Sequence, residues 1–329
     1  MTYLQAHKKL QTQWKLQTKY LSRAAKKPGL FANRLFPFCL PIEHAEENLF
    51  IGIRDDAIAY FDRHDISWHG AALPGKPGNH LCSSQILAVN MLYPFSTDAD
   101  AAKLLFSSVF PDIDTVLPIE EPGRFIAFEW VPPENYLNEI PKRGTTLRRG
   151  LGNTSADFAF LYRSVSGATR FILGEVKYTE SYGRSGHTIR SDGTDRMAPY
   201  RELFYAPDSP INTEIAPPIE AFAAEPFYQL LRYQLMARQV EVRKADVIDS
   251  ASVLYVYVPE NRGLRRVIVT EFREFGKDVF EAWSDMLTET RRLIPATTNL
   301  LCSLVLEDTP LGLTGWASYV KDRYRLSRS

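Results

Sequence analysis

Gly174-Glu175-Val176-Lys177 lies within an apolar run, residues 170–178, that predicts a β-strand. Side chains alternate between the two faces of a strand. Glu175 and Lys177 should therefore point the same way, about 7 Å apart along the strand, while Val176 points to the other face. This spacing suits a carboxylate and an ammonium group that flank a single phosphate.

A second predicted strand, residues 156–162, brings Asp157 toward this pair. Ser166-Gly167 forms a short turn between the two strands, so we expect them to pair in antiparallel fashion. That pairing can place Asp157, Glu175 and Lys177 on one surface.

These three residue types are the ones that phosphodiester hydrolysis needs. Carboxylate oxygens hold Mg²⁺ at roughly 2.0–2.1 Å while leaving positions open for water, so we expect a Mg²⁺ (or Mn²⁺) cofactor. Such a cation polarises the phosphate and lowers the pKa of bound water. Lys177 would orient the attacking water or stabilise the transition state. The backbone carbonyl of Val176 is a further possible ligand.

A predicted helix over residues 226–240 carries Gln229 and Tyr233, four residues apart. Both side chains should lie on one helical face, about 6 Å apart along the axis. An amide and a phenol at this spacing can position a water molecule or contact a phosphate. Taken alone, this segment is more typical of an amphipathic helix with ordinary polar residues than of a helix that carries a functional pair.

Together these motifs resemble the PD-(D/E)XK nuclease superfamily, which has the restriction-endonuclease-like fold, over roughly residues 79–260. The Gln229/Tyr233 pair is most similar to the RecB-type and lambda-exonuclease-like branches. The resemblance implies metal ligands at Asp157 and Glu175 and a catalytic lysine at Lys177. It also implies a catalytic Gln/Tyr pair on the helix.

Two details concern how closely the chain follows this pattern. Ala156 stands where the superfamily name has proline, a substitution that costs little. The same branches place a further metal ligand upstream, for which His80 is the first candidate and Glu129 the second.

The resemblance also implies the fold class, and the segments outside it complete the expected domain organisation. We expect an α/β fold with a restriction-endonuclease-like core of order αβββαβ, in which helices flank a mixed central sheet. Residues 1–78 form a mainly helical, basic N-terminal extension. Residues 79–295 form the nuclease-like core, with an insertion at about 181–224, and residues 296–329 form a C-terminal tail that packs on the core.

Further elements follow from apolar periodicity and from turn residues. Ser83 or Ser84 is a good N-cap for a buried helix that ends before Pro94. The other predicted helices cover residues 46–63 and 275–293. The other predicted strands cover residues 66–69, 124–131, 253–258 and 267–269.

Charge bears on the substrate. The chain has 39 Lys+Arg and 39 Asp+Glu residues, so it does not bind nucleic acid through bulk charge, although a local basic face is possible. Polar and basic residues next to the predicted site are candidate nucleic-acid contacts. They are Ser83, Ser84, Arg143, Arg148, Arg149, Arg184 and Arg232. Each of these arginines, taken alone, is more commonly surface charge.

The cysteine content and the hydropathy indicate a soluble, cytoplasmic protein. The three cysteines are far apart and form no C-x-x-C motif, and there is neither a signal peptide nor an apolar run of about 18 residues. We therefore expect no membrane partner.

The function that fits best is a metal-dependent DNA endonuclease in defence, mobile-element or repair work. An RNA-directed nuclease of the same fold is the first alternative. A non-catalytic nucleic-acid-binding or assembly module is the second. A homodimer or an assembly partner is compatible with each of the three.

Overall fold

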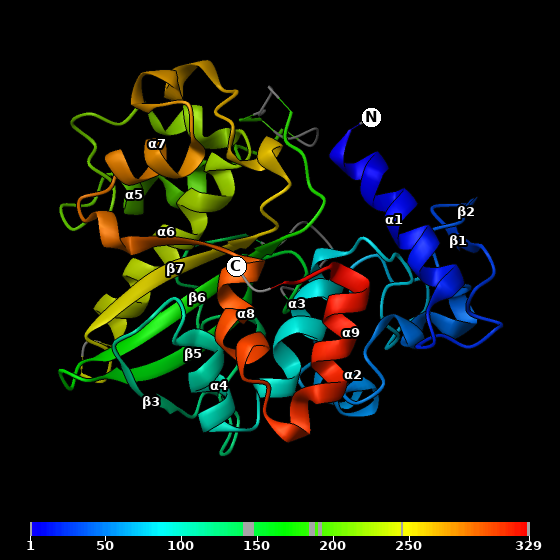
Figure 1. Cartoon of the computed structure of the whole chain (residues 1–329). Helices are drawn as coiled ribbons and strands as arrows, with labels where there is room; N and C mark the ends of the chain where they lie inside the picture. The colour runs from blue at the N-terminus through cyan, green and yellow to red at the C-terminus, as the bar shows by residue number, and fades with distance from the viewer. Residues whose placement is uncertain (1, 141–147, 184–187, 190–192, 245, 328–329) are drawn as a thin grey trace.

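The computed structural model describes residues 2–140, 148–183, 188–189, 193–244 and 246–327 (Figure 1). Its α-helices are α1 (Tyr3–Gln17), α2 (Arg54–Arg63), α3 (Ser84–Leu92), α4 (Ala99–Phe106), α5 (Arg201–Phe204), α6 (Phe227–Arg243), α7 (Val279–Asp285), α8 (Thr298–Glu307) and α9 (Thr314–Tyr324). Its strands are β1 (Gly29–Phe31), β2 (Arg34–Phe36), β3 (Ile113–Leu117), β4 (Ala127–Trp130), β5 (Ala156–Ser164), β6 (Thr169–Lys177), β7 (Ser250–Tyr257) and β8 (Leu293–Thr297). None of the helices in this part of the chain combines the length and the apolar composition that a membrane crossing requires.

The central sheet is mixed. Its strand order is β3-β5-β6-β7-β8, and β4 also pairs with β5. β5 and β6 form an antiparallel hairpin, with Gly167 in a left-handed conformation (φ +88°) in its turn. β6, β7 and β8 run parallel. Helix α6 crosses over between β6 and β7, as parallel strands require.

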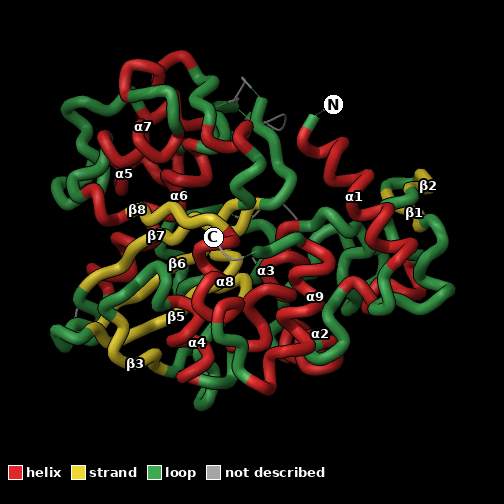
Figure 2. Tube along the Cα trace, in the orientation of Figure 1, coloured by secondary structure: helices red, strands yellow, loops and turns green. Residues whose placement is uncertain are grey.

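Two hydrophobic cores lie on the two faces of this sheet. Phe158, Ile172 and Val176 enter one core, while Ala159 and Leu173 enter the other. Helices α3, α4, α8 and α9 cover the first face, and α5, α6 and α7 cover the second (Figures 1 and 2). This arrangement confirms the predicted α/β class with a mixed central sheet between helices.

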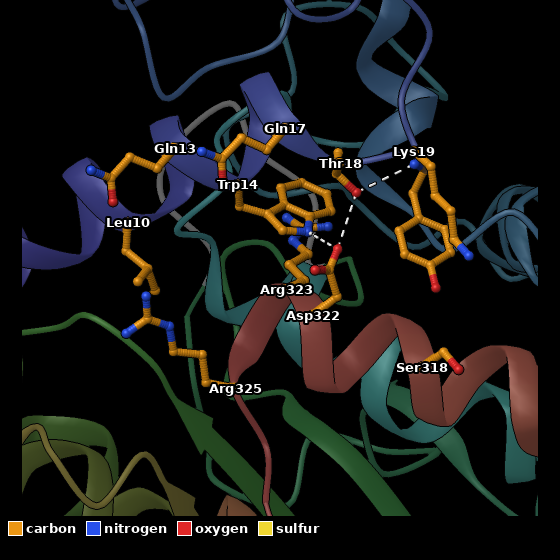
Figure 3. Close-up of a pocket in the computed structure, with 11 residues that line it drawn as sticks. Leu10, Gln13, Trp14, Gln17, Thr18, Lys19, Ser318, Asp322, Arg323 and Arg325 are labelled. Carbon is orange, nitrogen blue, oxygen red and sulfur yellow. Dashed lines mark hydrogen bonds between the residues drawn. The ribbon is translucent and has the colours of Figure 1, made fainter.

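The N-terminal and C-terminal helices pack against each other on the first face. Trp14 of α1 donates a hydrogen bond from Nε1 to Asp322 Oδ2 of α9 (2.8 Å) (Figure 3). Gln11 of α1 donates one to the carbonyl of Arg323 (3.1 Å). Residues of α1, α2, α3 and α9 share one hydrophobic core. The predicted division at residues 78 and 295 stays a prediction, but segments on both sides of each boundary contribute to this core.

Several predicted elements differ from the structure. The helix predicted over 46–63 is interrupted, because the Phe50 N–H donates to Asn90 Oδ1 (2.7 Å) instead of continuing a helix, and α2 begins only at Arg54. The strand predicted over 66–69 is wrong. The Gln85 side chain donates to the Ser67 carbonyl and accepts from the His69 N–H, so these backbone groups pair with a side chain and not with a neighbouring strand. The strand predicted over 267–269 is also wrong. The helix predicted over 275–293 shortens to α7.

Candidate active site

The candidate site forms where β5 and β6 separate. Paired residues in this hairpin run as far as Phe158 and Gly174. Beyond them, the Val176 N–H donates to Asp157 Oδ2 (2.8 Å), so a side chain replaces the ladder hydrogen bond. The gap between the strands opens toward α6, and Asp157, Glu175 and Lys177 line it, as the alternation of the strands predicts.

Gly174 has a packing role beside this opening. A Cβ atom built on it would lie 2.1 Å from the Phe158 ring, which covers the glycine on the apolar face of the sheet. Any larger residue would displace either the ring or the strand. The glycine therefore lets β6 carry Glu175 close to the strand that carries Asp157.

Glu175 is held by three donors. Gln229 Nε2 donates to Oε1 (2.8 Å), Lys177 Nζ forms an ion pair with the same oxygen (2.5 Å), and the Tyr233 hydroxyl lies against Oε2. The side chain is buried, at 3% exposed. The hydroxyl of Tyr233 also lies within hydrogen-bonding distance of the Ser155 carbonyl (2.6 Å). The predicted Gln229/Tyr233 pair thus fixes the orientation of this carboxylate.

Glu129 on β4 is the third carboxylate of the site. Its backbone is in the left-handed region (φ +46°), a strained conformation for a residue with a side chain. Its carboxylate accepts a hydrogen bond from Gln85 Nε2 (2.7 Å), and His69 Nε2 lies 3.6 Å away. Strand β4 pairs Phe128 with Phe158 and Trp130 with Ala156, which brings Glu129 opposite Asp157.

Burial and mutual repulsion raise the pKa values of two of these carboxylates. Burial, together with the neighbouring Glu175 and Glu129 charges, raises the pKa of Asp157 well above its ordinary value. Burial also raises the pKa of Glu129: its effect exceeds the lowering effects of His69 and Gln85, and the Glu175 charge adds a smaller increase. Burial alone would lower the pKa of Lys177, but the neighbouring acidic groups, Glu175 first among them, together more than offset this, so its pKa lies well above the ordinary value.

The cleft around these groups has a volume of about 210 Å³. It is lined by His69, Ser84, Gln85, Glu129, Gly150, Asn153, Thr154, Ser155, Asp157, Glu175, Val176, Lys177, Glu180, Gln229, Arg232 and Tyr233. In the described part of the chain, no three His, Cys, Asp or Glu side chains are arranged closely enough to enclose a metal ion by themselves. A cation here would therefore need ligands besides the carboxylates, as Mg²⁺ commonly does.

His80, the first candidate for an upstream ligand, lies elsewhere. Its ring packs against Phe31 and Phe38, and its Nδ1 accepts the Cys82 N–H (3.1 Å). Burial, together with the nearby Lys8, lowers its pKa to about 4. Of the two candidates, the structure brings only Glu129 to the cleft.

The candidate nucleic-acid contacts divide into four groups. Arg232 and Ser84 line the cleft, and the Ser84 hydroxyl donates to Glu180. Arg149 is committed to Glu120 (2.8 Å) and to backbone carbonyls of β4, and Arg148 pairs with Asp65 (3.3 Å). Ser83 is the N-cap of α3, where its hydroxyl accepts the Ile86 N–H. Arg143 and Arg184 lie outside the described residues.

Some cleft residues were not among the predicted site residues. Asn153, Thr154 and Ser155 immediately precede β5 and form one wall, and Gln85 and His69 form another. The polar residues directly before the strand of Asp157 could have predicted the first wall from the sequence. No spacing rule links His69 or Gln85 to that strand.

Comparison with known families supplies the remaining context. Residues 8–325 match the model of a family described as Restriction Endonuclease associating with ARP. Searches of curated proteins and of solved structures found no match. Because the family match spans nearly all of the sequence, the chain belongs to the family Restriction Endonuclease associating with ARP.

Proposed function

We propose that this chain is a metal-dependent endonuclease that hydrolyses phosphodiester bonds in DNA at the cleft between β5, β6 and α6. The observation that carries the proposal is the convergence of Asp157, Glu175 and Lys177 in one cleft, with Gln229 and Tyr233 holding Glu175. Membership in a restriction endonuclease family supports the reaction class. Assignment to the PD-(D/E)XK superfamily, and to its RecB-type and lambda-exonuclease-like branches, is part of the proposal.

The donor set fits a hard divalent cation such as Mg²⁺ or Mn²⁺. Asp157 and Glu175 would hold it, with the Val176 carbonyl as a further oxygen ligand, while Glu129 lines the same cleft. The raised pKa values of Asp157 and Glu129 support this fit, because a cation among these carboxylates would relieve their repulsion. When bound, the cation supplies Lewis acidity and offsets the negative charge of the phosphate.

The protein side chains supply orientation and charge. Gln229 and Tyr233 fix the Glu175 carboxylate, and the Asp157 carboxylate is fixed by the Val176 N–H. Lys177 stays protonated at neutral pH because its pKa is raised. It therefore acts as a cation that stabilises charge on the phosphate or donates a proton, and not as the base that activates water.

The partner belongs to the proposal as well. The family description speaks of association with ARP, and we infer that this chain acts within an assembly that contains such a partner. A homodimer is the alternative for the isolated chain. Light scattering across a concentration series separates the two: a monomer at every concentration favours the heterologous assembly.

The direct test incubates the purified protein with plasmid and linear DNA, and in parallel with RNA, in the presence of Mg²⁺, Mn²⁺ or EDTA. We expect metal-dependent cutting of closed circular DNA, which has no ends and so requires an endonuclease. Glu175→Gln and Lys177→Ala should abolish it, and Lys321→Ala on the exposed face of α9 serves as the matched control. Cutting that persists in EDTA or in Lys177→Ala would contradict the proposal. Cleavage of RNA alone, or binding without cleavage, would select one of the alternatives.

A further inference from the structure

A second cavity lies next to the candidate active site. Its volume is about 510 Å³, and Asn153 and Arg232 line both this cavity and the cleft. Its remaining lining comes mainly from the segment after β6 and from the start of α6. A molecule held at the carboxylates can therefore extend into this second space past Arg232.

The wall of the cavity is aromatic and cationic. The guanidinium groups of Arg196 and Arg232 lie over the Tyr228 ring, at 3.9 and 4.4 Å from its centroid. The Tyr200 hydroxyl lies 3.3 Å from that of Tyr228. Planar guanidinium and phenol groups are surfaces on which a planar ligand stacks.

The acids of the cavity already have partners. Glu139 accepts hydrogen bonds from Thr154 and from the Tyr200 hydroxyl (2.7 Å). Asp195 pairs with Arg201 (3.3 Å), and Glu225 accepts the Gln229 N–H (3.2 Å). The charges of Glu139 and Glu225 are also offset by Arg232, which interacts electrostatically with both.

The two arginines, by contrast, retain donor capacity. Within the described residues, Arg232 donates once, to Thr154 Oγ1 (3.2 Å), and its Nε is buried with no hydrogen-bond partner. Arg196 donates once, to the Ala223 carbonyl at a long 3.4 Å. A guanidinium carries five N–H donors, so both groups can bind an additional acceptor.

We propose that this cavity receives an unpaired nucleobase of the strand whose phosphate lies at the carboxylates. Arg232, on the border between the two spaces, contacts the connecting phosphate. A base is planar, uncharged and rich in acceptors, which suits stacking surfaces with spare donors and balanced charge. The cavity volume lies in the usual range for small-ligand sites. This inference rests on the proposed function, and it defines the substrate class as DNA with an unpaired nucleotide beside the cleaved bond.

Binding by the full chain, in Ca²⁺ so that cleavage is not required, tests the cavity. Anisotropy is measured with three labelled duplexes: fully paired, with one extra unpaired nucleotide, and with the same bulge lacking its base. The bulge position is scanned along the duplex. We expect the bulge with a base to bind about tenfold more tightly than the abasic bulge at one position, a difference that corresponds to about 1.4 kcal/mol.

Two variants locate the effect. Ala198→Trp, at an exposed residue that lines the cavity, should remove the preference for the base. Ser318→Trp places the same side chain in the cavity between α1 and α9 and should leave the preference intact (Figure 3). Arg196→Gln should reduce the preference without filling the cavity, which keeps the test decisive if Ala198→Trp folds poorly.

The outcomes separate the two proposals. Equal affinity for the bulges with and without a base at every position, or an undiminished preference in both Ala198→Trp and Arg196→Gln, overturns the cavity proposal and leaves DNA cleavage standing. Failure of the wild-type protein to cut any DNA with Mg²⁺ or Mn²⁺ overturns the proposed function. In that case the base preference in Ca²⁺ still decides whether the cavity binds a base.

Discussion

Two buried polar clusters on opposite faces of the sheet differ in how their charges are balanced. In the Arg323 cluster, a single cation donates to neutral acceptors: the Asn48 carbonyl (2.7 Å), the Tyr319 hydroxyl (2.6 Å) and the Leu81 carbonyl (3.3 Å). In the Glu175 cluster, the carboxylates of Glu129, Asp157 and Glu175 share one ammonium, that of Lys177. Within the described residues, neutral hydrogen-bond acceptors hold the Arg323 guanidinium, although its Nε has no partner, whereas three carboxyl groups surround one ammonium in the Glu175 cluster.

This difference separates stability from function. A buried charge with good partners holds elements together, and removing it leaves those partners unsatisfied. A group of buried like charges costs stability and persists where a ligand uses it. The Arg323 cluster should therefore control unfolding, and the Glu175 cluster should control catalysis.

The largest effect is expected for Arg323→Met. The change leaves Asn48 Oδ1 and the Leu81 carbonyl without this donor in the core, which should lower the free energy of unfolding by about 3–5 kcal/mol in total. Urea denaturation measures this loss, with exposed Lys321→Ala as the control. Cleavage per folded molecule should not change. A variant of full stability would show that the cluster does not hold α9 in place.

The next effect is expected for Asp157→Asn. Loss of this carboxylate should reduce DNA cleavage on the order of 10²–10³-fold, since it removes a proposed metal ligand. The same variant should be more stable than the wild type at neutral pH, because one repelling charge is gone. Loss of stability together with activity would mean that the cluster is structural.

The sign of the pH dependence follows from the raised pKa of Asp157. The folded protein holds this proton more tightly than the unfolded chain, so the associated stability is present at low pH and is lost as pH rises through the folded pKa. The stability gain of Asp157→Asn should thus grow with rising pH and vanish below about pH 4. Denaturation midpoints measured across this interval check the trend.

A smaller effect on rate is expected for Tyr233→Phe. The variant removes the hydroxyl that orients Glu175 and should lower kcat about 10–100-fold with little change in KM. Tyr319→Phe is the matched change in the Arg323 cluster, and it should lower stability while leaving kcat unchanged. Loss of stability without loss of kcat in Tyr233→Phe, and the opposite in Tyr319→Phe, would contradict the roles assigned to the two clusters.

The smallest effect concerns His80, whose carbonyl accepts from Asn48 of the Arg323 cluster. Its pKa is lowered to about 4 in the folded protein, so the unfolded chain binds its proton first as the pH falls. Stability present above about pH 6.5 is then lost as the pH drops toward 4, by about 2 kcal/mol at pH 5. His80→Gln should lose less stability between pH 7.5 and pH 5. An equal loss in both proteins would assign the acid sensitivity to other groups.

The sequence predicted the centre of this molecule better than its periphery. The sequence pattern of strands β5 and β6 and of helix α6 shows which residues share a face. It could therefore place the site residues on facing surfaces: Asp157, Glu175, Lys177, Gln229 and Tyr233. Other elements, among them α4, β3, β8, α8 and α9, were not predicted. β3 is a short edge strand with two exposed residues in its middle, which weakens any alternation.

The choice between His80 and Glu129 could not be made from the sequence. It depends on β4 pairing with the start of β5, a long-range register that brings a left-handed residue opposite Asp157. It depends also on Phe31 and Phe38, which surround His80 from a separate hairpin region. Neither contact leaves a local pattern in the sequence.

The contact between α1 and α9 has a consequence for how the protein is made on the ribosome. Trp14 and its partner Asp322 are 308 positions apart in the sequence. Helix α1 leaves the ribosome long before α9, and Trp14 gains its contacts with Asp322 and Tyr319 only after α9 has been synthesised. Until α9 has been synthesised, this side of α1 lacks one of its packing partners, and the Arg323 cluster cannot form. A nascent chain that is released before α9 would lack these contacts to Trp14, so the environment of this tryptophan reports whether α9 has docked.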